Sequence, residues 1–204
     1  MELQNKIVGI VGRKGSGKSR KFRELMQRSP RLVVFDTMGE HSWIPNRFHD
    51  LNDLSEFLAW ASTQRTCAVS LIPEADLDAD FATLCEWVYE DGNFTLGVEE
   101  AAMLCQPSYL PPEFDRIVRL GRHRRVNMVW TSQRMAEVAR RLTAATDLFV
   151  LFTHSEPRDL DAMAERCGQE VAERVARLPL HGWLAWDVVR GEVIRPERVV
   201  EALA

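Results

Sequence analysis

The sequence predicts an α/β fold in which a mostly parallel central sheet is flanked by helices. Short apolar runs alternate with helical stretches along the chain, which is typical of successive strand–helix units. The apolar runs are nearly continuous, as expected of parallel strands that are covered on both faces. With 204 residues, the chain is long enough for one domain (1–204) with a substantial core.

The strands are expected where apolar runs end in turn signals, and the helices where apolar residues recur with helical spacing. The segment 41–50 is expected to be irregular, and Asp53 is the expected N-cap of the helix after it. Pro111 or Pro112 should begin a later helix, because proline is favoured at the first helical position. The expected strands are 7–11, 32–35, 67–72, 94–98, 126–130 and 147–152, and the expected helices are 19–27, 51–63, 78–89, 112–120, 135–145, 159–166 and 169–177.

The last part of the chain is expected to form an antiparallel hairpin at a sheet edge. Residues 182–186 and 192–194 are apolar runs, and Arg190-Gly191 between them suits a turn. We interpret residues of about 180–200 as a small appendage of the same domain.

The composition is that of an ordinary globular protein, with 46% apolar and 27% charged residues. The chain lacks the ~18-residue apolar run of a membrane-spanning helix, so an integral membrane protein is not expected. Strand 7–11 begins too early to leave room for a signal peptide. The four cysteines form no C-x-x-C pair or zinc pattern, which favours a reducing cytosolic setting. The net charge of −4 does not by itself indicate a nucleic-acid-binding protein.

A phosphate-binding motif follows the first expected strand. Residues 12–19 match G-x-x-x-x-G-K-[ST] at every fixed position, between a strand and a helix as this motif requires. The glycines let successive N–H groups face one anion, and the helix adds its positive end. Lys18 should reach the β- and γ-phosphates of ATP, and the Ser19 hydroxyl should ligate Mg²⁺. The expected nucleotide-binding residues are Gly12, Arg13, Lys14, Gly15, Ser16, Gly17, Lys18 and Ser19.

Acidic and amide residues follow three other expected strands. Asp36 ends the second strand and is expected either at the active-site edge of the sheet or as the cap of a turn. Glu99 and Glu100 follow the fourth strand, where many P-loop ATPases hold the Mg²⁺ shell and polarise the attacking water, respectively. Aspartate is more usual in the position of Glu99, and a charged strand-to-helix turn is the alternative interpretation. Gln133 follows the fifth strand and could orient the lytic water.

Together these residues resemble the HerA/FtsK-type DNA translocases, a branch of the P-loop ATPases. The resemblance rests on the loop, on Val-Phe-Asp-Thr-Met-Gly-Glu-His at 34–41, on Val-Glu-Glu-Ala at 98–101, and on 121–134 with its ending Thr-Ser-Gln-Arg. It covers most of residues 6–190 in the order of the family. It implies a RecA-like P-loop NTPase fold of the ASCE type, in which the fifth strand inserts between the first and the fourth.

The chain lacks the extra domains of FtsK and HerA proteins and looks like the minimal genome-packaging ATPases of membrane-containing tailless icosahedral viruses. This resemblance implies an ATPase that converts ATP and water to ADP and phosphate with Mg²⁺. It also implies a homo-oligomeric ring, a hexamer or pentamer, that pulls double-stranded DNA into a capsid. The implied partners are capsid or membrane vertex proteins, and the implied location is the host cytoplasm or the packaging vertex.

In this family an arginine from the neighbouring subunit completes the active site. Such an arginine is worth about 10³–10⁵ in rate in GTPases. The cluster before the fifth strand could instead be a solvated helix end or a contact for DNA phosphates. The candidates by position are Arg119, Arg122, Arg124 and Arg125.

Two other function classes remain open on the sequence. A small-molecule P-loop kinase would also fit the length and the loop, with residues 116–125 as an arginine-rich lid. A nucleotide-binding protein of phage morphogenesis or secretion that does not hydrolyse ATP would fit as well, although Glu100 and Gln133 argue against it.

Overall fold

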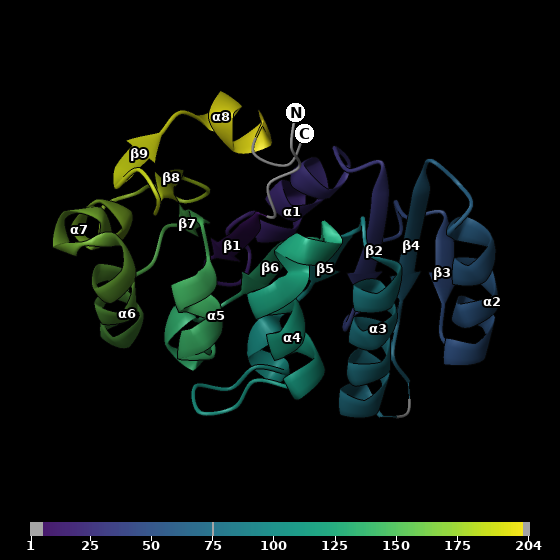
Figure 1. Cartoon of the computed structure of the whole chain (residues 1–204). Coiled ribbons are helices and arrows are strands. Elements are labelled where there is room, and N and C mark those ends of the chain that lie inside the picture. Colours follow the sequence, from purple (N-terminus) through teal and green to yellow (C-terminus); the bar gives the residue numbers. More distant parts are fainter. Residues whose placement is uncertain (1–5, 75, 202–204) are drawn as a thin grey trace.

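The computed structural model describes residues 6–74 and 76–201. Within these residues, nine strands form one sheet in the order β3-β4-β2-β5-β6-β1-β7-β8-β9 (Figure 1). All pairs from β3 to β7 are parallel, whereas β8 and β9 are antiparallel. The predicted α/β class with a mostly parallel sheet and a final hairpin is therefore confirmed.

The strands are β1 (Ile7–Val11), β2 (Arg31–Phe35), β3 (Asn46–Phe48), β4 (Cys67–Leu71), β5 (Thr95–Val98), β6 (Asn127–Ser132), β7 (Leu148–Phe152), β8 (Trp183–Asp187) and β9 (Glu192–Ile194). The α-helices are α1 (Lys18–Met26), α2 (Leu51–Ala61), α3 (Leu77–Asp91), α4 (Pro112–Leu120), α5 (Arg140–Ala145), α6 (Pro157–Cys167), α7 (Gln169–Ala176) and α8 (Pro196–Glu201). Short 3₁₀ turns are η1 (Ala101–Met103), η2 (Gly121–Arg124) and η3 (Met135–Glu137).

The core has two parts, one on each face of the sheet. Val8 and Ile10 of β1 pack with Phe22 of α1 on one face. Ile7 and Val11 point to the other face, where the larger core part includes residues of α3, α4 and α6. Successive side chains of a strand alternate between faces, so continuous apolar strands are what a doubly covered sheet requires. Among the described helices, none has the length and apolar character needed to cross a membrane.

The order of the central strands decides where the site lies. β6 pairs with β5 on one side and with β1 on the other, for example through Gly97 with Val129 and Ile10 with Thr131. This is the insertion that the family resemblance implied. The carboxyl ends of β1, β5 and β6 consequently lie side by side, and the residues after them meet at one edge of the sheet.

Three local expectations were wrong. The segment 41–50 contains the strand β3, which at three residues is too short for a periodic signal. Asp50, not Asp53, is the N-cap of α2, because the Asp50 carboxylate accepts the backbone N–H groups of Asn52 and Asp53. The expected helix 135–145 is divided into η3 and α5, since Val138 and Ala139 have extended backbones. The helix α8 after the hairpin was not expected at all.

Candidate active site

The loop between β1 and α1 has the backbone shape that anion binding needs. Gly15 and Gly17 have φ angles of 76° and 107°, which side chains disfavour. A Cβ atom on Gly12 would lie 2.5 Å from the Cβ of Phe152. Gly17 is the N-cap of α1 and offers no side-chain cap, so the first N–H groups of α1 are available to an anion.

The loop borders a cleft of about 710 Å³ at the carboxyl edge of the sheet. The cleft unites the end of the loop with the residues that follow β5 and β6. The structure therefore brings together most of the positions proposed from the sequence. Its polar lining consists of Lys14, Lys18, Ser19, Glu40, Glu99, Glu100, Ser132, Gln133, Arg134 and Glu137.

Lys18 lies between the loop and the glutamate pair. Its Nζ is 3.7 Å from Oε1 of Glu100 and donates a hydrogen bond of 3.5 Å to the carbonyl of Arg13. Burial lowers the pKa of the Lys18 ammonium, and the charge of Glu100 opposes this shift. A phosphate group at the loop would supply this buried cation with a second anion beside Glu100.

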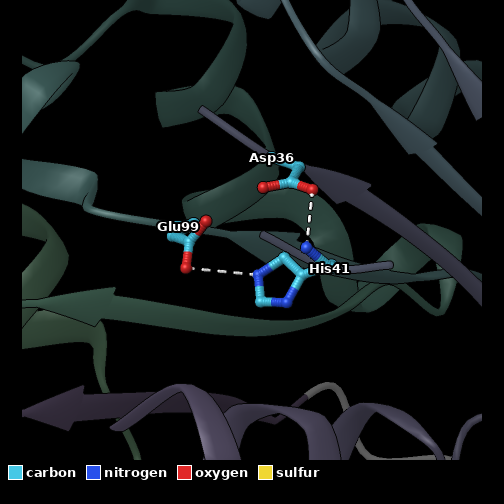
Figure 2. Close-up of side chains that lie close together, drawn as sticks. All are labelled: Asp36, His41 and Glu99. Carbon is cyan, nitrogen blue, oxygen red and sulfur yellow. Dashed lines mark hydrogen bonds and ion pairs between the residues drawn. The ribbon is translucent and has the colours of Figure 1, made fainter. Parts of the chain in front are cut away.

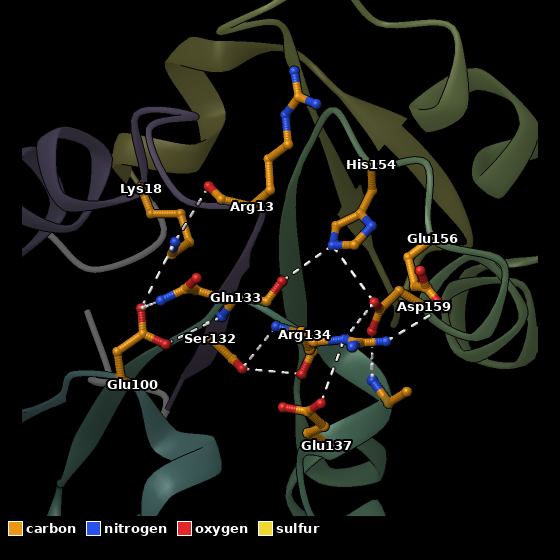
Figure 3. Close-up of polar contacts among 11 residues, drawn as sticks. Arg13, Lys18, Glu100, Ser132, Gln133, Arg134, Glu137, His154, Glu156 and Asp159 are labelled. Atoms are coloured by element: carbon orange, nitrogen blue, oxygen red, sulfur yellow. Dashed lines mark hydrogen bonds and ion pairs between the residues drawn. The ribbon is translucent and has the colours of Figure 1, made fainter.

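Glu100 is held in a backbone conformation that is costly for a residue with a side chain. Its φ and ψ are 46° and 55°, a left-handed conformation that costs about 1–2 kcal/mol in an L-residue. The Glu100 N–H donates to the Thr131 hydroxyl at 3.0 Å. The Glu100 carboxylate accepts the backbone N–H of Gln133 at 3.2 Å and its side-chain amide at 3.3 Å (Figure 3). Two strand ends thus fix Glu100 beside Lys18.

A network of ion pairs anchors the chain after Gln133. The Nε atom of Arg134 donates to the buried Asp159 at 3.1 Å, and His154 Nε2 lies 3.1 Å from the carbonyl of Gln133 (Figure 3). Arg134 also pairs with Glu137 at 3.4 Å. The sequence motif suggested Gln133, but it carried no signal for partners that come from a helix more than twenty positions away.

Glu99 belongs to a buried cluster behind the cleft. The ligand atoms of Asp36, His41 and Glu99 all lie within 4.8 Å of one another, and His41 Nε2 is 3.3 Å from Glu99 Oε1 (Figure 2). The Asp36 carboxylate accepts the N–H groups of Glu40 and His41, each at 3.0 Å. Asp36 therefore caps its turn and also stands beside Glu99, which unites the two alternatives left by the sequence. The role of His41 in this cluster was not predicted from the sequence.

The oxygen groups at this point fit a magnesium ion. Glu99 is 4% exposed, yet its Oε2 has no hydrogen-bond partner among the described residues. Burial raises the pKa of the Glu99 carboxyl, His41 opposes the shift, and Asp36 adds to it. Hard cations prefer carboxylate and hydroxyl oxygens, and Ser19 lines the same cleft. Ser19 and Glu99 could therefore hold Mg²⁺.

A second hollow, of about 290 Å³, adjoins the other side of the loop. It lies between the first turn of α1 and the segment that leads into β8. His181 Nδ1 is 3.3 Å from the carbonyl of Ser16, and Lys21 Nζ is 4.2 Å from the centre of the Trp183 ring. This contact joins segments 165 positions apart, so the sequence gave no indication of it.

The four proposed arginines lie at the opposite edge of the sheet. Arg124 donates to the carbonyl oxygens of Tyr89 and Glu90, before β5 begins. Arg119 pairs with Asp115 at 3.0 Å. Within one chain, this cluster does not reach the cleft at the carboxyl ends of the same strands. The arrangement does not form the lid that a kinase would need over its own loop.

Comparison with known proteins finds the fold but no close sequence relative. No family model and no curated protein matches the sequence. The genome packaging NTPase B204 of Sulfolobus turreted icosahedral virus 2, with bound ATP-gammaS, matches with a TM-score of 0.77 at 22% identity, over 95% of this chain and 97% of that chain. B204 of Sulfolobus turreted icosahedral virus, a DNA-packaging ATPase, matches with a TM-score of 0.72 at 21% identity, with the same coverage.

Two bacterial proteins share the fold more distantly. VirB4 of Thermoanaerobacter pseudethanolicus matches with a TM-score of 0.57 at 13% identity, over 96% of this chain and 91% of that chain. The N-terminal domain of zonular occludens toxin from Neisseria meningitidis matches with a TM-score of 0.54 at 16% identity, over 98% and 92%. The chain therefore has the fold of the P-loop NTPases. The predicted resemblance is thus confirmed at the level of the fold.

Proposed function

We propose that this protein is an ATPase that moves double-stranded DNA into a viral capsid as a ring of identical subunits. The observation that carries the proposal is the contact set of Lys18, Glu100 and Gln133 at the mouth of the phosphate-binding loop. A similar fold in a genome packaging NTPase, over nearly the full length of both chains, supports the same function.

In this proposal the loop and Lys18 bind the phosphates of ATP, and Ser19 and Glu99 hold Mg²⁺. The ion neutralises charge on the phosphate oxygens. Glu100 acts as the general base that orients and polarises the attacking water. When a phosphate group of ATP pairs with the Lys18 ammonium, the Glu100 carboxylate loses its contact with Lys18 and can accept a proton from the attacking water. Gln133 holds the other side of the carboxylate and can report on the γ-phosphate.

The hollow between α1 and Trp183 supports a nucleotide rather than a bare polyphosphate as the ligand. The cleft with Glu100 lies on one side of the loop, and this hollow lies on the other side, against Ser16 and Gly17. A triphosphate that spans the loop would extend its nucleoside into the hollow. Aromatic side chains there can pack against a base.

The arginines at the amino edge suit a role between subunits, in a hexamer or pentamer. The Arg122 side chain contacts its neighbour His123 at 3.4 Å. Among the described residues, the Arg125 side chain has no hydrogen bond or ion pair, although its backbone N–H donates to the carbonyl of Arg122. Arg119 and Arg124 are engaged within the subunit. Arg122 and Arg125 are therefore the best candidates to complete the site of the adjacent subunit. The proposed partners are double-stranded DNA and capsid or membrane vertex proteins. The proposed location is the host cytoplasm or the packaging vertex.

The central test measures phosphate release by wild type and Glu100→Gln, with and without double-stranded DNA, together with the assembly state. We expect ATPase activity that requires assembly and is stimulated by DNA, and that Glu100→Gln abolishes while nucleotide binding remains. Release of ADP with a nucleoside or sugar acceptor instead of DNA would indicate a kinase. Absence of ADP release by the assembled wild type would indicate a binding protein.

A further inference from the structure

The buried cluster of Asp36, His41 and Glu99 has two possible uses. Its three ligand atoms lie within 4.8 Å of one another, so it could bind a metal ion of its own. The 3.3 Å between His41 Nε2 and Glu99 Oε1 equals the spacing of about 3.3 Å between two ligands of a tetrahedral zinc ion with ~2.0 Å bonds. Alternatively, His41 could orient Glu99. The two uses require different tautomers of the histidine.

The second nitrogen of His41 decides between them. The indole Nε1–H of Trp43 donates a hydrogen bond of 3.3 Å to Nδ1 of His41. An indole N–H is only a donor, so Nδ1 must carry a lone pair. The proton of the neutral imidazole then resides on Nε2, the atom that faces Glu99. A metal ion bound to Nε2 would need a lone pair on that atom, so the proton would have to be on Nδ1. That proton would then point at the indole N–H of Trp43, and two donors would face each other.

Packing fixes the imidazole in this place. The His41 ring stacks on Phe22 of α1 with ring centres 4.8 Å apart, and His41 is 2% exposed. Its backbone N–H is held by the buried carboxylate of Asp36. The ring therefore has a set position relative to both α1, which begins at the phosphate-binding loop, and Glu99.

We propose that His41, with its tautomer set by Trp43, is a positioning residue that directs Glu99 toward the Mg²⁺ bound with the nucleotide. Nε2 of His41 faces Oε1 of Glu99 at 3.3 Å, an ion-pair contact that lacks hydrogen-bond geometry. Oε2 of Glu99 has no hydrogen-bond partner among the described residues and remains for the ion and its water. This explains how a glutamate serves where the shorter aspartate is usual: its longer side chain is held by a second residue. The proposal rests on the proposed function of the site.

The experiment compares His41→Gln with His41→Phe. Glutamine can place an N–H donor near the position of Nε2, whereas phenylalanine keeps the stacking on Phe22 without any donor. The first readout is the gain in affinity for an ATP analogue on adding Mg²⁺, measured by titration calorimetry. Loss of an outer-shell partner typically costs 10–100-fold in metal affinity. We expect His41→Phe to reduce the Mg²⁺-dependent gain about tenfold, and His41→Gln to retain most of it.

The second readout is the tautomer of His41, observed by ¹⁵N NMR of the wild-type protein without nucleotide. We expect the proton on Nε2, and in Trp43→Phe a shift of population toward the Nδ1–H form. Trp60→Phe is the matched control. It removes the same indole group, but from a side chain that is 57% exposed and far from the cluster. It should leave both readouts unchanged.

Three results would overturn the proposal. One is a proton on Nδ1 in the wild type with tight binding of added Zn²⁺ that His41→Phe abolishes, which would show a separate metal site. The second is equal Mg²⁺ dependence in His41→Phe and wild type. The third is an equal loss in His41→Gln and His41→Phe, which would show packing alone. Neither readout uses turnover, so an inactive wild type would refute the proposed function without deciding the role of His41.

Discussion

The two edges of the central sheet use their polar groups in opposite ways. At the amino edge, the guanidinium of Arg31 donates to the carbonyls of Ala61 and Gln64 and to the carboxylate of Asp91, at 3.1, 2.9 and 2.8 Å. The backbone N–H of Ile7 donates to Asp147 at 2.8 Å. Partners within the chain satisfy most of these groups, although Nε of Arg31 has none among the described residues.

At the carboxyl edge, several buried polar atoms lack partners among the described residues. They include Oγ of Ser16, Oγ1 of Thr37, Nε2 of His41 and Oε2 of Glu99. Left-handed backbones occur at both edges, in Glu100 here and in Asn93 and Arg125 at the amino edge. The contrast therefore lies in the unsatisfied polar atoms, which cost free energy. The contrast teaches that the amino edge contributes to stability, whereas the carboxyl edge gives up stability to remain open to a ligand.

The largest effect should come from Glu100→Gln at the carboxyl edge. We expect kcat to fall about 10³-fold, within the range for loss of a general base, while nucleotide affinity and Tm stay close to wild type. Phosphate release and equilibrium binding measure the two effects. Glu86→Gln, at an exposed position of α3 outside the cleft, is the control and should keep its activity. Turnover at the parent rate in Glu100→Gln would remove Glu100 from the mechanism.

The next largest effect is expected from Lys18→Ala. Nucleotide affinity should fall about 100-fold, because the phosphates lose their charge-assisted contact. Burial lowers the pKa of Lys18, so the charged lysine costs stability at neutral pH. The free energy of unfolding, from urea titration without nucleotide, should therefore not fall. A large loss of stability would mean that this edge also supports the fold.

Arg31→Met is the converse test at the amino edge, where we expect a loss of stability and no loss of nucleotide binding. It leaves the carbonyls of Ala61 and Gln64 and the Asp91 carboxylate without their shared donor, at a cost of about 2–3 kcal/mol. Urea unfolding should show this loss, while nucleotide affinity of the folded protein stays unchanged. Arg65→Met, a nearby arginine with an exposed side chain, is the control. If Arg31→Met weakened nucleotide binding, the division between the edges would not hold.

The smallest effect concerns Glu99→Gln. The pKa of the Glu99 carboxyl is raised in the folded protein above its ordinary value of 4.5. Just above pH 4.5, the unfolded state has therefore lost a proton that the folded state still holds. The contribution of Glu99 to stability therefore decreases as pH rises through this window. At pH 7, Glu99→Gln should raise Tm by a few degrees and abolish the Mg²⁺-dependent gain in nucleotide affinity. The Tm difference should shrink below pH 4.5; a difference independent of pH would contradict this explanation.

The strands and the loop were predictable because local signals carry them. Residues 12–19 contain the whole motif, and the apolar runs predict every strand except β3, whose three residues show no period. The ends of β5 and β6 could be singled out because an acid or amide directly follows each buried run. The placement of these ends side by side was not readable from periodicity. It came from the resemblance to a family with a known strand order.

The rest of the site depends on contacts between distant segments. His41 reads as an ordinary residue of an irregular stretch, and only the parallel pairing of β2 with β5 brings it to Glu99. Thr131 of β6 likewise acts through a single hydrogen bond to Glu100, which follows another strand. Sequence patterns report the period of one element, but not which polar atom of another element lies opposite.

The central position of β1 also has a consequence for how the chain folds. Its neighbours β6 and β7 follow it along the chain, by 121 and 140 positions in the contacts that join them. Closing such long loops precedes any gain from the pairing, so these contacts form slowly. On the ribosome, β2, β4 and β5 can pair before β1 has either neighbour. The phosphate-binding loop is thus made well before the strands that complete its site, and the nucleotide site is among the last parts of the described fold to form.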